Sequence, residues 1–416
     1  MKILLCHNYY QQPGGEDQVF ADESRLLEAR GHQVVQYTRH NDEVASAGRM
    51  GTALRTIWSG PSYGELKRII RRERPQIVHF TNTFPLISPA AYYAAQAAGA
   101  KVVQSLHNYR LLCPSGLLLR DGQACEECLA KRIAWPAVRH GCYRGKSGSA
   151  VVAAMLAGHR AMGTWTSAVD RYIALTRFAR AKFIAGGLPE RKISLKPNFV
   201  DPDPGPGDGA DGYAIFVGRL SEEKGIDTLL AACHRLESPT ELRIIGDGPL
   251  RDQVEAACAR DVRIRWLGRR PIEQVLEAIG RASLLVFPSN CYETFGRTIA
   301  EAFAKGTPVI ASDLGAAAEL VTPGLTGATF AVGNPEALAG AVAAAQSDPE
   351  RLAAMRGAAR REYEQHYTPD ANYEMLMAIY SSVLAGDPAV APALPAEPSA
   401  TQSLKSESAS YQEVSQ

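Results

Sequence analysis

Two glutamates with seven residues between them, Glu293 and Glu301, are the most informative polar pair in the chain. They follow the apolar run Leu284–Phe287, which predicts Glu293 in a loop at a strand end and Glu301 two turns into the next helix. The free backbone N–H groups expected at that helix start, on Phe295 and Gly296, would stabilise an anion. The carboxylates can accept hydrogen bonds from hydroxyl groups, which a sugar and a ribose present. The alternative interpretation is that the two glutamates simply lie on a solvent-exposed helix face.

Two cations follow another apolar run, Tyr213–Val217. Arg219 comes directly after Gly218, and Lys224 stands near the start of the next predicted helix. An arginine binds a diphosphate with a fork of N–H donors, whereas a lysine acts as a point charge. The pair is therefore suited to hold a departing diphosphate. Ordinary surface charges are the alternative interpretation.

The elements that must position these side chains alternate between short strands and longer helical segments, which predicts parallel sheets with right-handed crossovers. In the first half we predict strands at Lys2–Cys6, Gln33–Tyr37, Ile77–Phe80, Lys101–Leu106 and Arg171–Leu175. In the second half we predict strands at Tyr213–Val217, Glu241–Ile245, Arg263–Trp266, Leu284–Phe287 and Val309–Ala311. The fold class is α/β, with two Rossmann-like, doubly wound domains that face each other across a cleft.

Composition shifts mark the expected domain boundaries. Prolines and glycines dominate residues 201–212, so this stretch is predicted to be a linker between domains at 1–200 and 213–368. Residues 369–384 keep an apolar helix face and are predicted to dock on a domain. The tail, 385–416, lacks apolar periodicity and is predicted to be disordered.

Charge and the amino terminus exclude several classes of protein. The 416 residues include 45 Lys and Arg against 44 Asp and Glu, a formal net charge of +1. Such a chain has no global positive field, so nucleic acid is not an expected partner. The amino terminus lacks the apolar core of a signal peptide, and we therefore expect a cytoplasmic protein whose cysteines are reduced.

From Met1 to about Leu384 the sequence resembles the family-4 retaining glycosyltransferases of the GT-B fold, also described as glycosyl transferases group 1. The motifs that carry the resemblance are Pro13-Gly14-Gly15-Glu16, Gly218-Arg219-Leu220 with Glu223-Lys224-Gly225, Gly246-Asp247-Gly248-Pro249, and Glu293 with Glu301. The resemblance implies transfer of a hexose from a nucleotide sugar, in the synthesis of cell-surface polysaccharide or glycolipid. It implies no catalytic cofactor, the nucleotide sugar being the substrate.

The resemblance also implies roles for individual residues on the donor side. Arg219 and Lys224 hold the donor diphosphate, Glu293 contacts the donor sugar, and Glu301 binds the ribose hydroxyls. These cations and the helix N–H groups neutralise the leaving diphosphate, so no divalent metal is required. We expect attack by the acceptor hydroxyl on the face from which the diphosphate departs, with a phosphate oxygen as the base.

Three further residues approach the donor from the opposite domain in this family. Gly14 and Gly15 approach the diphosphate, although a tight turn alone would also explain them. His107, after the fourth predicted strand, lies by the donor sugar. A packed or capping histidine is the alternative interpretation.

The acceptor, a glycan or a lipid-linked glycan, is assigned to the first domain. Glu16 opens a helix beside the glycine loop and either orients a hydroxyl or interacts with the helix dipole. Asn82 follows the third predicted strand, faces the same cleft and is predicted to touch the acceptor.

Two basic segments of the first domain, 67–74 and 131–146, are candidates for peripheral contact with the inner face of an anionic cytoplasmic membrane. For the first segment a solvated helix face is the alternative. The second mixes Trp135 and Tyr143 with lysines and arginines, which suits a bilayer interface.

Four cysteines cluster in the same domain: Cys113, Cys125, Cys128 and Cys142. A Cys-x-x-Cys pair with two flanking cysteines could form a tetrahedral structural zinc site. Reduced thiols in a loop are the equal alternative.

Two rival functions remain open. A sugar-nucleotide epimerase on the same fold needs the same nucleotide site, and a catalytically degenerate module would bind a nucleotide sugar without transferring it. A dinucleotide-binding protein is disfavoured because no G-x-G-x-x-G follows the first strand.

Overall fold

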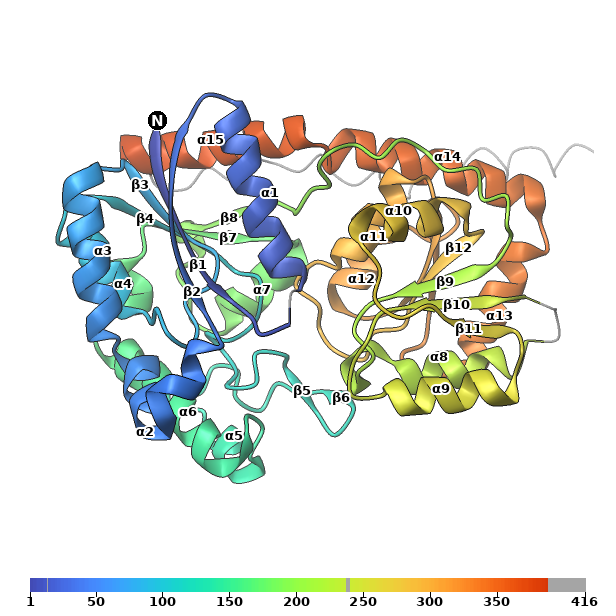
Figure 1. Cartoon of the computed structure of the whole chain (residues 1–416), viewed down its shortest axis with the longest axis horizontal. Coiled ribbons are helices and arrows are strands. Elements are labelled where there is room, and N and C mark those ends of the chain that lie inside the picture. Colours follow the sequence, from blue (N-terminus) through green and yellow to red (C-terminus); the bar gives the residue numbers. More distant parts are fainter. Residues whose placement is uncertain (13, 237–239, 388–416) are drawn as a thin grey trace, which may run out of the picture.

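The first sheet of the protein carries six parallel strands (Figure 1). The computed structural model describes residues 1–12, 14–236 and 240–387. The strand order is β2-β1-β3-β4-β7-β8. The strands are β1 (Lys2–Tyr9), β2 (Gln33–His40), β3 (Ile77–Phe80), β4 (Lys101–Ser105), β7 (Arg171–Ala174) and β8 (Ile193–Leu195). Strands β1 and β2 pair along their whole length: Lys2 lies opposite Gln33 at one end, and Tyr9 lies opposite His40 at the other.

Helices connect and cover this sheet (Figure 1). They are α1 (Gly15–Ala29), α2 (Glu43–Ile57), α3 (Gly60–Glu73), α4 (Ala90–Gln96), α5 (Trp135–His140), α6 (Gly145–Ala161) and α7 (Arg177–Ala185). α3 shows why such segments fold locally: the Ser59 side chain caps its first turn, and Leu66 and Ile70 bury one face. A short hairpin, β5 (Leu119–Arg120) and β6 (Gln123–Ala124), projects from the loop after β4.

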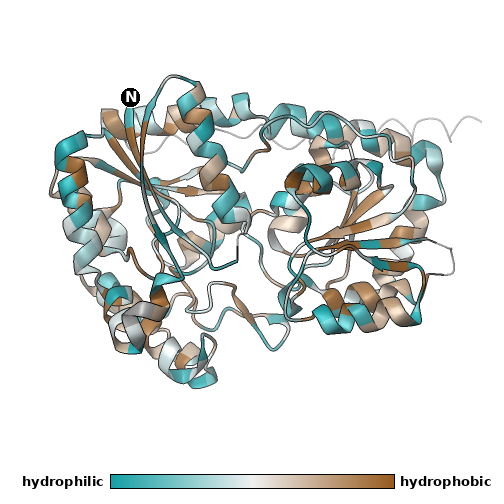
Figure 2. Ribbon diagram, in the orientation of Figure 1, coloured by the Kyte–Doolittle hydropathy of each residue, from teal (hydrophilic) through white to brown (hydrophobic). Residues whose placement is uncertain are grey.

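The second sheet repeats the plan with the strand order β11-β10-β9-β12-β13-β14. Its strands are β9 (Ala214–Val217), β10 (Leu242–Ile245), β11 (Ile264–Trp266), β12 (Leu284–Phe287), β13 (Val309–Ser312) and β14 (Gly327–Phe330). Its helices are α8 (Ile226–Cys233), α9 (Arg251–Arg260), α10 (Ile272–Arg281), α11 (Arg297–Ala304), α12 (Gly315–Leu320) and α13 (Pro335–Gln346). Most strands are hydrophobic and lie at the centre of each domain, and the helices that surround them are largely hydrophilic on the outside (Figure 2).

The predicted fold class is therefore confirmed, with two doubly wound parallel sheets. Besides the hairpin β5–β6, the structure adds one strand to each of these sheets that sequence reasoning missed. β8 has only three residues, and β14 contains glycine and alanine, which are poor strand formers. Both complete the far edge of a sheet.

The segment predicted to be a linker, 201–212, is tied to the second domain. The N–H of Gly207 donates to the Lys305 carbonyl at 2.9 Å, and the N–H of Gly209 donates to the Gly280 carbonyl at 2.9 Å. Arg356 donates to the Gly207 carbonyl at 2.9 Å. The chain therefore crosses between the domains along a fixed path.

Two long helices end the described chain. α14 (Pro349–His366) packs on the second domain, and α15 (Pro369–Ala385) crosses back to the first (Figure 1). Leu376, Ile379, Tyr380 and Val383 of α15 join an apolar cluster with β1, β3, β4 and β7. The tail predicted to be disordered lies outside the described residues from 388 onward.

Candidate functional site

The strand ends of the two sheets face each other across the domain interface. In each sheet the strand order reverses once, between β1 and β3 and between β9 and β12, and ligands of such folds bind at that point. Hydrogen bonds join the domains there. The Thr294 hydroxyl donates to the His107 carbonyl at 2.7 Å, and the Tyr109 hydroxyl donates to the Glu293 carbonyl at 3.2 Å.

Glu293 and Lys224 form the centre of the donor side. The Lys224 ammonium lies 2.6 Å from Glu293 Oε1, which also accepts a hydrogen bond from the Ser289 hydroxyl at 2.6 Å. Burial works to lower the pKa of Lys224, but Glu293 outweighs it and the pKa is raised. Burial likewise opposes ionisation of Glu293, yet Lys224 lowers its pKa. Both groups are therefore charged, and among the described residues Glu293 Oε2 has no protein hydrogen-bond partner.

Local backbone geometry brings these two groups together. Lys224 ends a short 3-10 helix, Glu222–Lys224, and Gly225 follows it with φ of 69°. A Cβ atom at Gly225 would lie 1.9 Å from the Pro288 carbonyl oxygen, so only glycine lets this turn approach the end of β12. Glu293 stands five residues beyond Pro288.

Arg219 has a different environment from Lys224. Its side chain is exposed beyond the end of β9, next to half-buried Gly218. Within the described part of the chain it makes no ion pair. The structure therefore pairs one expected diphosphate ligand, Lys224, with Glu293 and leaves the other cation open to solvent.

The start of α11 offers N–H donors to the same region. Gly296 caps this helix with φ of 97°, a conformation that favours glycine. Among the described residues, no protein acceptor pairs with the N–H groups of Phe295 and Gly296. Glu301 lies just over one turn into α11, not two, because the helix begins at Arg297.

His107 stands at the end of β4, as expected, and is neutral. Burial lowers its pKa to about 3, although the carboxylate of Glu23 acts in the opposite direction. Its Nε2 atom is buried and has no hydrogen-bond partner within the described residues. A neutral imidazole whose Nε2 atom is unpaired can bind a ligand hydroxyl.

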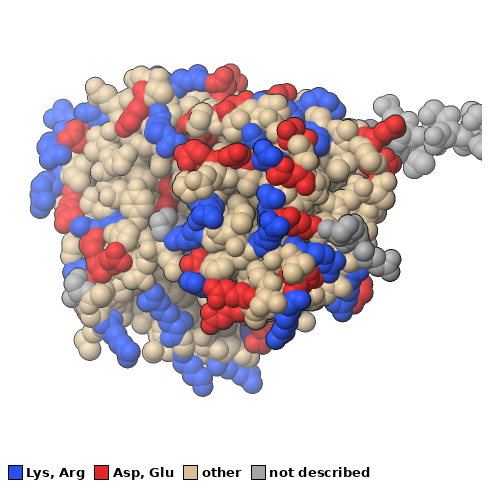
Figure 3. Space-filling view, turned by 45° about the vertical axis from the view of Figure 1, so that its right-hand side comes forward, with Lys and Arg blue, Asp and Glu red and all other residues tan. Residues whose placement is uncertain are grey.

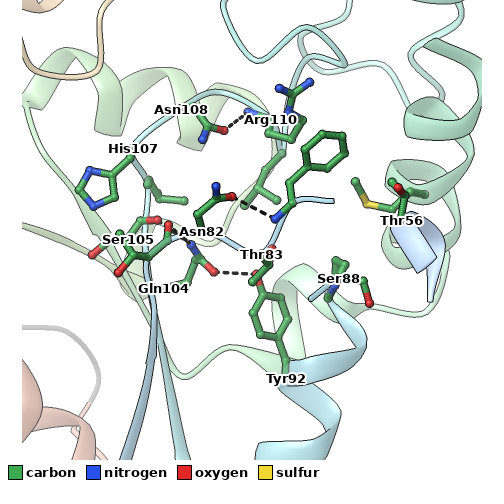
Figure 4. Close-up of a pocket in the computed structure, with 16 residues that line it drawn as sticks. Thr56, Asn82, Thr83, Ser88, Tyr92, Gln104, Ser105, His107, Asn108 and Arg110 are labelled. Carbon is green, nitrogen blue, oxygen red and sulfur yellow. Dashed lines mark hydrogen bonds between the residues drawn. The ribbon is translucent and has the colours of Figure 1, made fainter. Parts of the chain in front are cut away.

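A pocket of about 40 Å³ in the first domain has His107 in its wall, together with several polar side chains (Figure 4). Asn82 lines it, but its amide also fixes the surrounding loop. The Asn82 side chain donates to the Asn8 carbonyl at 2.8 Å and accepts from the Phe84 N–H at 3.0 Å. Asn82 therefore shapes this wall and has only one amide hydrogen left for an acceptor.

Glu16 lies in the first turn of α1, which begins at Gly15 with Gly14 as its cap. The Tyr10 hydroxyl donates to Glu16 Oε2 at 2.7 Å, and Asn108 lies 3.5 Å from the same oxygen. Glu16 Oε1 is buried without a hydrogen-bond partner among the described residues. Burial raises the pKa of Glu16 to about 7, against the hydrogen bond from Tyr10. Pro13 of the glycine loop is not among the described residues.

The four clustered cysteines do not support the predicted zinc site. In the described ranges, no three His, Cys, Asp or Glu side chains are arranged to hold a metal ion. All four are free thiols. Burial raises the pKa of the Cys128 thiol to about 11, and Cys113, Cys142 and Cys125 act in the same direction. Cys128 and Cys142 pack in a small apolar cluster with Ala134, Ala137 and Ala153.

Sequence reasoning missed two residues at this interface, Arg297 and Asp22. Arg297 lies 2.7 Å from Asp22 of α1 and 2.8 Å from Glu301. No motif marks the Asp22 contact, since it depends on how the domains face each other.

Family comparisons agree with this architecture. The family described as "Glycosyltransferase Family 4" matches residues 13–204, and "Glycosyl transferases group 1" matches residues 203–362. Together the two matches cover both sheets. The chain belongs to the family-4 glycosyltransferases.

Curated relatives match over part of their length. Glycogen synthase of Mycobacterium tuberculosis H37Rv is 34% identical over 191 residues, covering 44% of this chain and 45% of that protein. Phosphatidyl-myo-inositol mannosyltransferase of Propionibacterium freudenreichii is 34% identical over 150 residues, covering 35% and 37%. The matched regions span less than half of these relatives.

Solved structures show the fold across nearly the whole chain. Anabaena HepE in complex with UDP and glucose aligns with a TM-score of 0.66 and 19% identity, covering 92% of this chain and all of that one. Sucrose-phosphate synthase of Thermosynechococcus elongatus aligns with a TM-score of 0.66 and 17% identity, covering 93% and 100%. These likenesses support the GT-B fold, as predicted from the sequence.

Proposed function

We propose that this chain is a retaining, metal-independent glycosyltransferase that moves a hexose from a nucleotide sugar to a glycan or lipid-linked acceptor. Cell-surface polysaccharide or glycolipid synthesis is the setting we propose. The observation that carries the proposal is the charged Lys224–Glu293 pair at the strand-order reversal of the second sheet, next to Thr294, which contacts the His107 carbonyl. Support comes from HepE, a structural neighbour whose crystals hold UDP and glucose.

The leaving diphosphate meets three kinds of positive partner in this proposal. Arg219 is exposed and unpaired in the described structure, Lys224 is ionised, and the N–H groups at the start of α11 have no protein acceptor. Fixed donors aimed at developing charge stabilise a transition state without reorganising. No divalent metal is needed for that purpose.

The way Glu293 is held disfavours a covalent sugar–enzyme intermediate in this proposal. Its Oε1 atom is engaged by Lys224 and Ser289, which reduces its nucleophilicity and favours hydrogen bonding to the donor sugar through Oε2. We infer that the acceptor hydroxyl attacks on the leaving-group face and passes its proton to a phosphate oxygen. Neutral His107 binds a sugar hydroxyl, and Glu301 binds the ribose hydroxyls.

The acceptor lies against the first domain in this proposal. The buried, unpaired oxygen of Glu16 and the pocket lined by Asn82 lie on the side of the glycine loop and His107. Either the carboxylate of Glu16 or its protonated form can orient a hydroxyl, since its pKa is near neutrality.

Release of free nucleotide tests the function. Purified protein is incubated with UDP-, GDP- and ADP-sugars, with and without a lipid or oligosaccharide acceptor extract, and with added EDTA in a parallel set. We expect acceptor-dependent nucleotide release that EDTA leaves unchanged, and an α-linked product from an α-linked donor by NMR. Acceptor-independent epimer formation would indicate an epimerase, and binding without turnover would indicate a degenerate module.

A further inference from the structure

One arginine, Arg297, lies buried between the two domains where their ligand-facing helices begin. Its side chain is 10% exposed although it stands at the first position of α11. A Cβ atom built on Gly15, at the start of α1, would lie 3.9 Å from Arg297 Cδ. The guanidinium stem therefore passes beside the glycine loop of the opposite domain.

Arg297 joins carboxylates from both domains. Its Nε atom donates to Glu301 Oε1 at 2.8 Å within α11. Its Nη2 atom lies 2.7 Å from Asp22 Oδ2 on α1, and Asp22 is fully buried. Gln18 and Arg25 also contact the other oxygen of Asp22. A planar guanidinium can hold two partners in fixed directions at once, which a lysine cannot do.

The third guanidinium nitrogen of Arg297 is not used in these contacts. Arg297 Nη1 is buried and has no hydrogen-bond partner within the described residues. Buried N–H donors of an ionised group are costly when unpaired, so this one points to a missing acceptor. An oxygen atom of a ligand between the two helix starts would complete the arrangement.

Building on the proposed function, we propose that Arg297 both positions Glu301 and contacts the donor, and so couples donor binding to the contact between the domains. It holds the Glu301 carboxylate in the orientation that accepts hydrogen bonds from the ribose hydroxyls. It ties the same carboxylate to Asp22 of the opposite domain, and its Nη1 donates to a diphosphate oxygen of the bound nucleotide.

The inference predicts that discrimination between ribose and deoxyribose depends on Arg297. Loss of a hydrogen-bonded hydroxyl is strongly penalised only while the protein partner is held in place. Without the guanidinium, the Glu301 side chain is free to turn away, and the 2′-hydroxyl of the nucleotide then adds little to its binding affinity. A residue that merely stabilised the fold would not change this ratio.

The test uses isothermal titration calorimetry with UDP, GDP and ADP, each beside its 2′-deoxy counterpart. The proteins are wild type, Arg297→Lys, Arg297→Met and Asp22→Asn, with Arg281→Met as a control that removes an ion pair of the second domain with Asp211. We expect wild type and Arg281→Met to bind the ribonucleotide about tenfold tighter than the deoxy form, the net effect of one hydrogen bond. In both Arg297 variants the ratio should fall to near one, while Asp22→Asn should keep it and instead reduce the nucleotide-induced compaction seen by small-angle scattering.

The outcomes separate the inference from the function it rests on. Wild type that binds none of the six nucleotides overturns the proposed function and this inference with it. Wild type that binds nucleotide without a ribose preference, or Arg297 variants that keep the preference, overturn the inference alone. Arg297→Lys retains the charge, so it provides the answer if Arg297→Met does not fold.

Discussion

Lys224 and Glu293 form an ion pair close to the end of β12, whereas Arg219 is exposed. In the proposed function, Lys224 faces the charge that develops on the diphosphate as the sugar leaves. Such a donor contributes mainly in the transition state, which affects turnover more than affinity.

We therefore predict that Lys224→Ala lowers kcat about 100-fold with a small change in donor KM. Steady-state kinetics with the preferred donor measures this, and melting temperatures show whether the variant folds without its partner for Glu293. Lys101→Ala, which removes a charge paired with Asp170 on β4, is the control and should keep wild-type kcat. Equal kcat for both variants would remove Lys224 from the mechanism.

Glu16 gives a second prediction at the same scale, on pH. The folded protein holds its proton up to about pH 7, whereas an unfolded chain releases it near 4.5, so this residue lowers stability as the pH rises through that range. Glu16→Gln should therefore gain melting temperature relative to wild type between pH 5 and pH 8. A melting-temperature difference between the two proteins that does not change with pH would contradict this prediction.

The same pKa predicts a pH dependence of activity. If the Glu16 carboxylate orients the acceptor, wild-type kcat/KM rises near pH 7 and Glu16→Gln loses that rise. Parallel pH profiles of kcat/KM for the two proteins would contradict this role.

At the scale of elements, alternating apolar runs were sufficient to predict ten strands and their parallel arrangement. All residues of β3 and β12 are buried in the core, so their apolar runs match the strands and the predicted bounds agree with the structure. β8 and β14 were missed because short edge strands owe their pairing to neighbours that a local pattern does not contain. Site pairs such as Lys224 with Glu293 could not be read from spacing, because they depend on which loops the sheet brings together.

The helix α15 shows the same dependence on distant partners, and it yields a prediction. Leu376 is fully buried against the first sheet although it lies at the far end of the chain. Leu376→Ala should destabilise the protein by about 2–5 kcal/mol, because it leaves a cavity in that cluster. Urea denaturation measures the change, with Glu374→Ala on the exposed face of the same helix as the control. Equal destabilisation by the two variants would mean that α15 does not contribute to this core.

At the scale of the whole molecule, the net charge of +1 conceals an uneven placement. Positive and negative side chains are interspersed over the face shown in Figure 3. Within the chain, opposite charges form ion pairs such as Arg281 with Asp211 and Arg360 with Asp203. The segment 131–146 differs because it combines exposed cations with Ile133 and Trp135, which are 57% and 52% exposed. On α3, by contrast, Glu73 pairs with Lys2 and Arg72. None of the helices within the described ranges has the length and apolarity to cross a bilayer.

This difference predicts which basic segment meets an anionic membrane, if the acceptor is lipid-linked. Each lysine or arginine near an anionic surface contributes about 1 kcal/mol, so removing Lys131 and Arg132 as K131A/R132A should weaken binding about 30-fold. Lys67→Ala with Arg68→Ala on α3 is the matched control and should bind as wild type does. Flotation with vesicles of phosphatidylglycerol and phosphatidylcholine, at low and high salt, measures both. Equal loss in the two double variants would assign the contact to net charge alone, and no flotation of wild type would remove the membrane from the proposal.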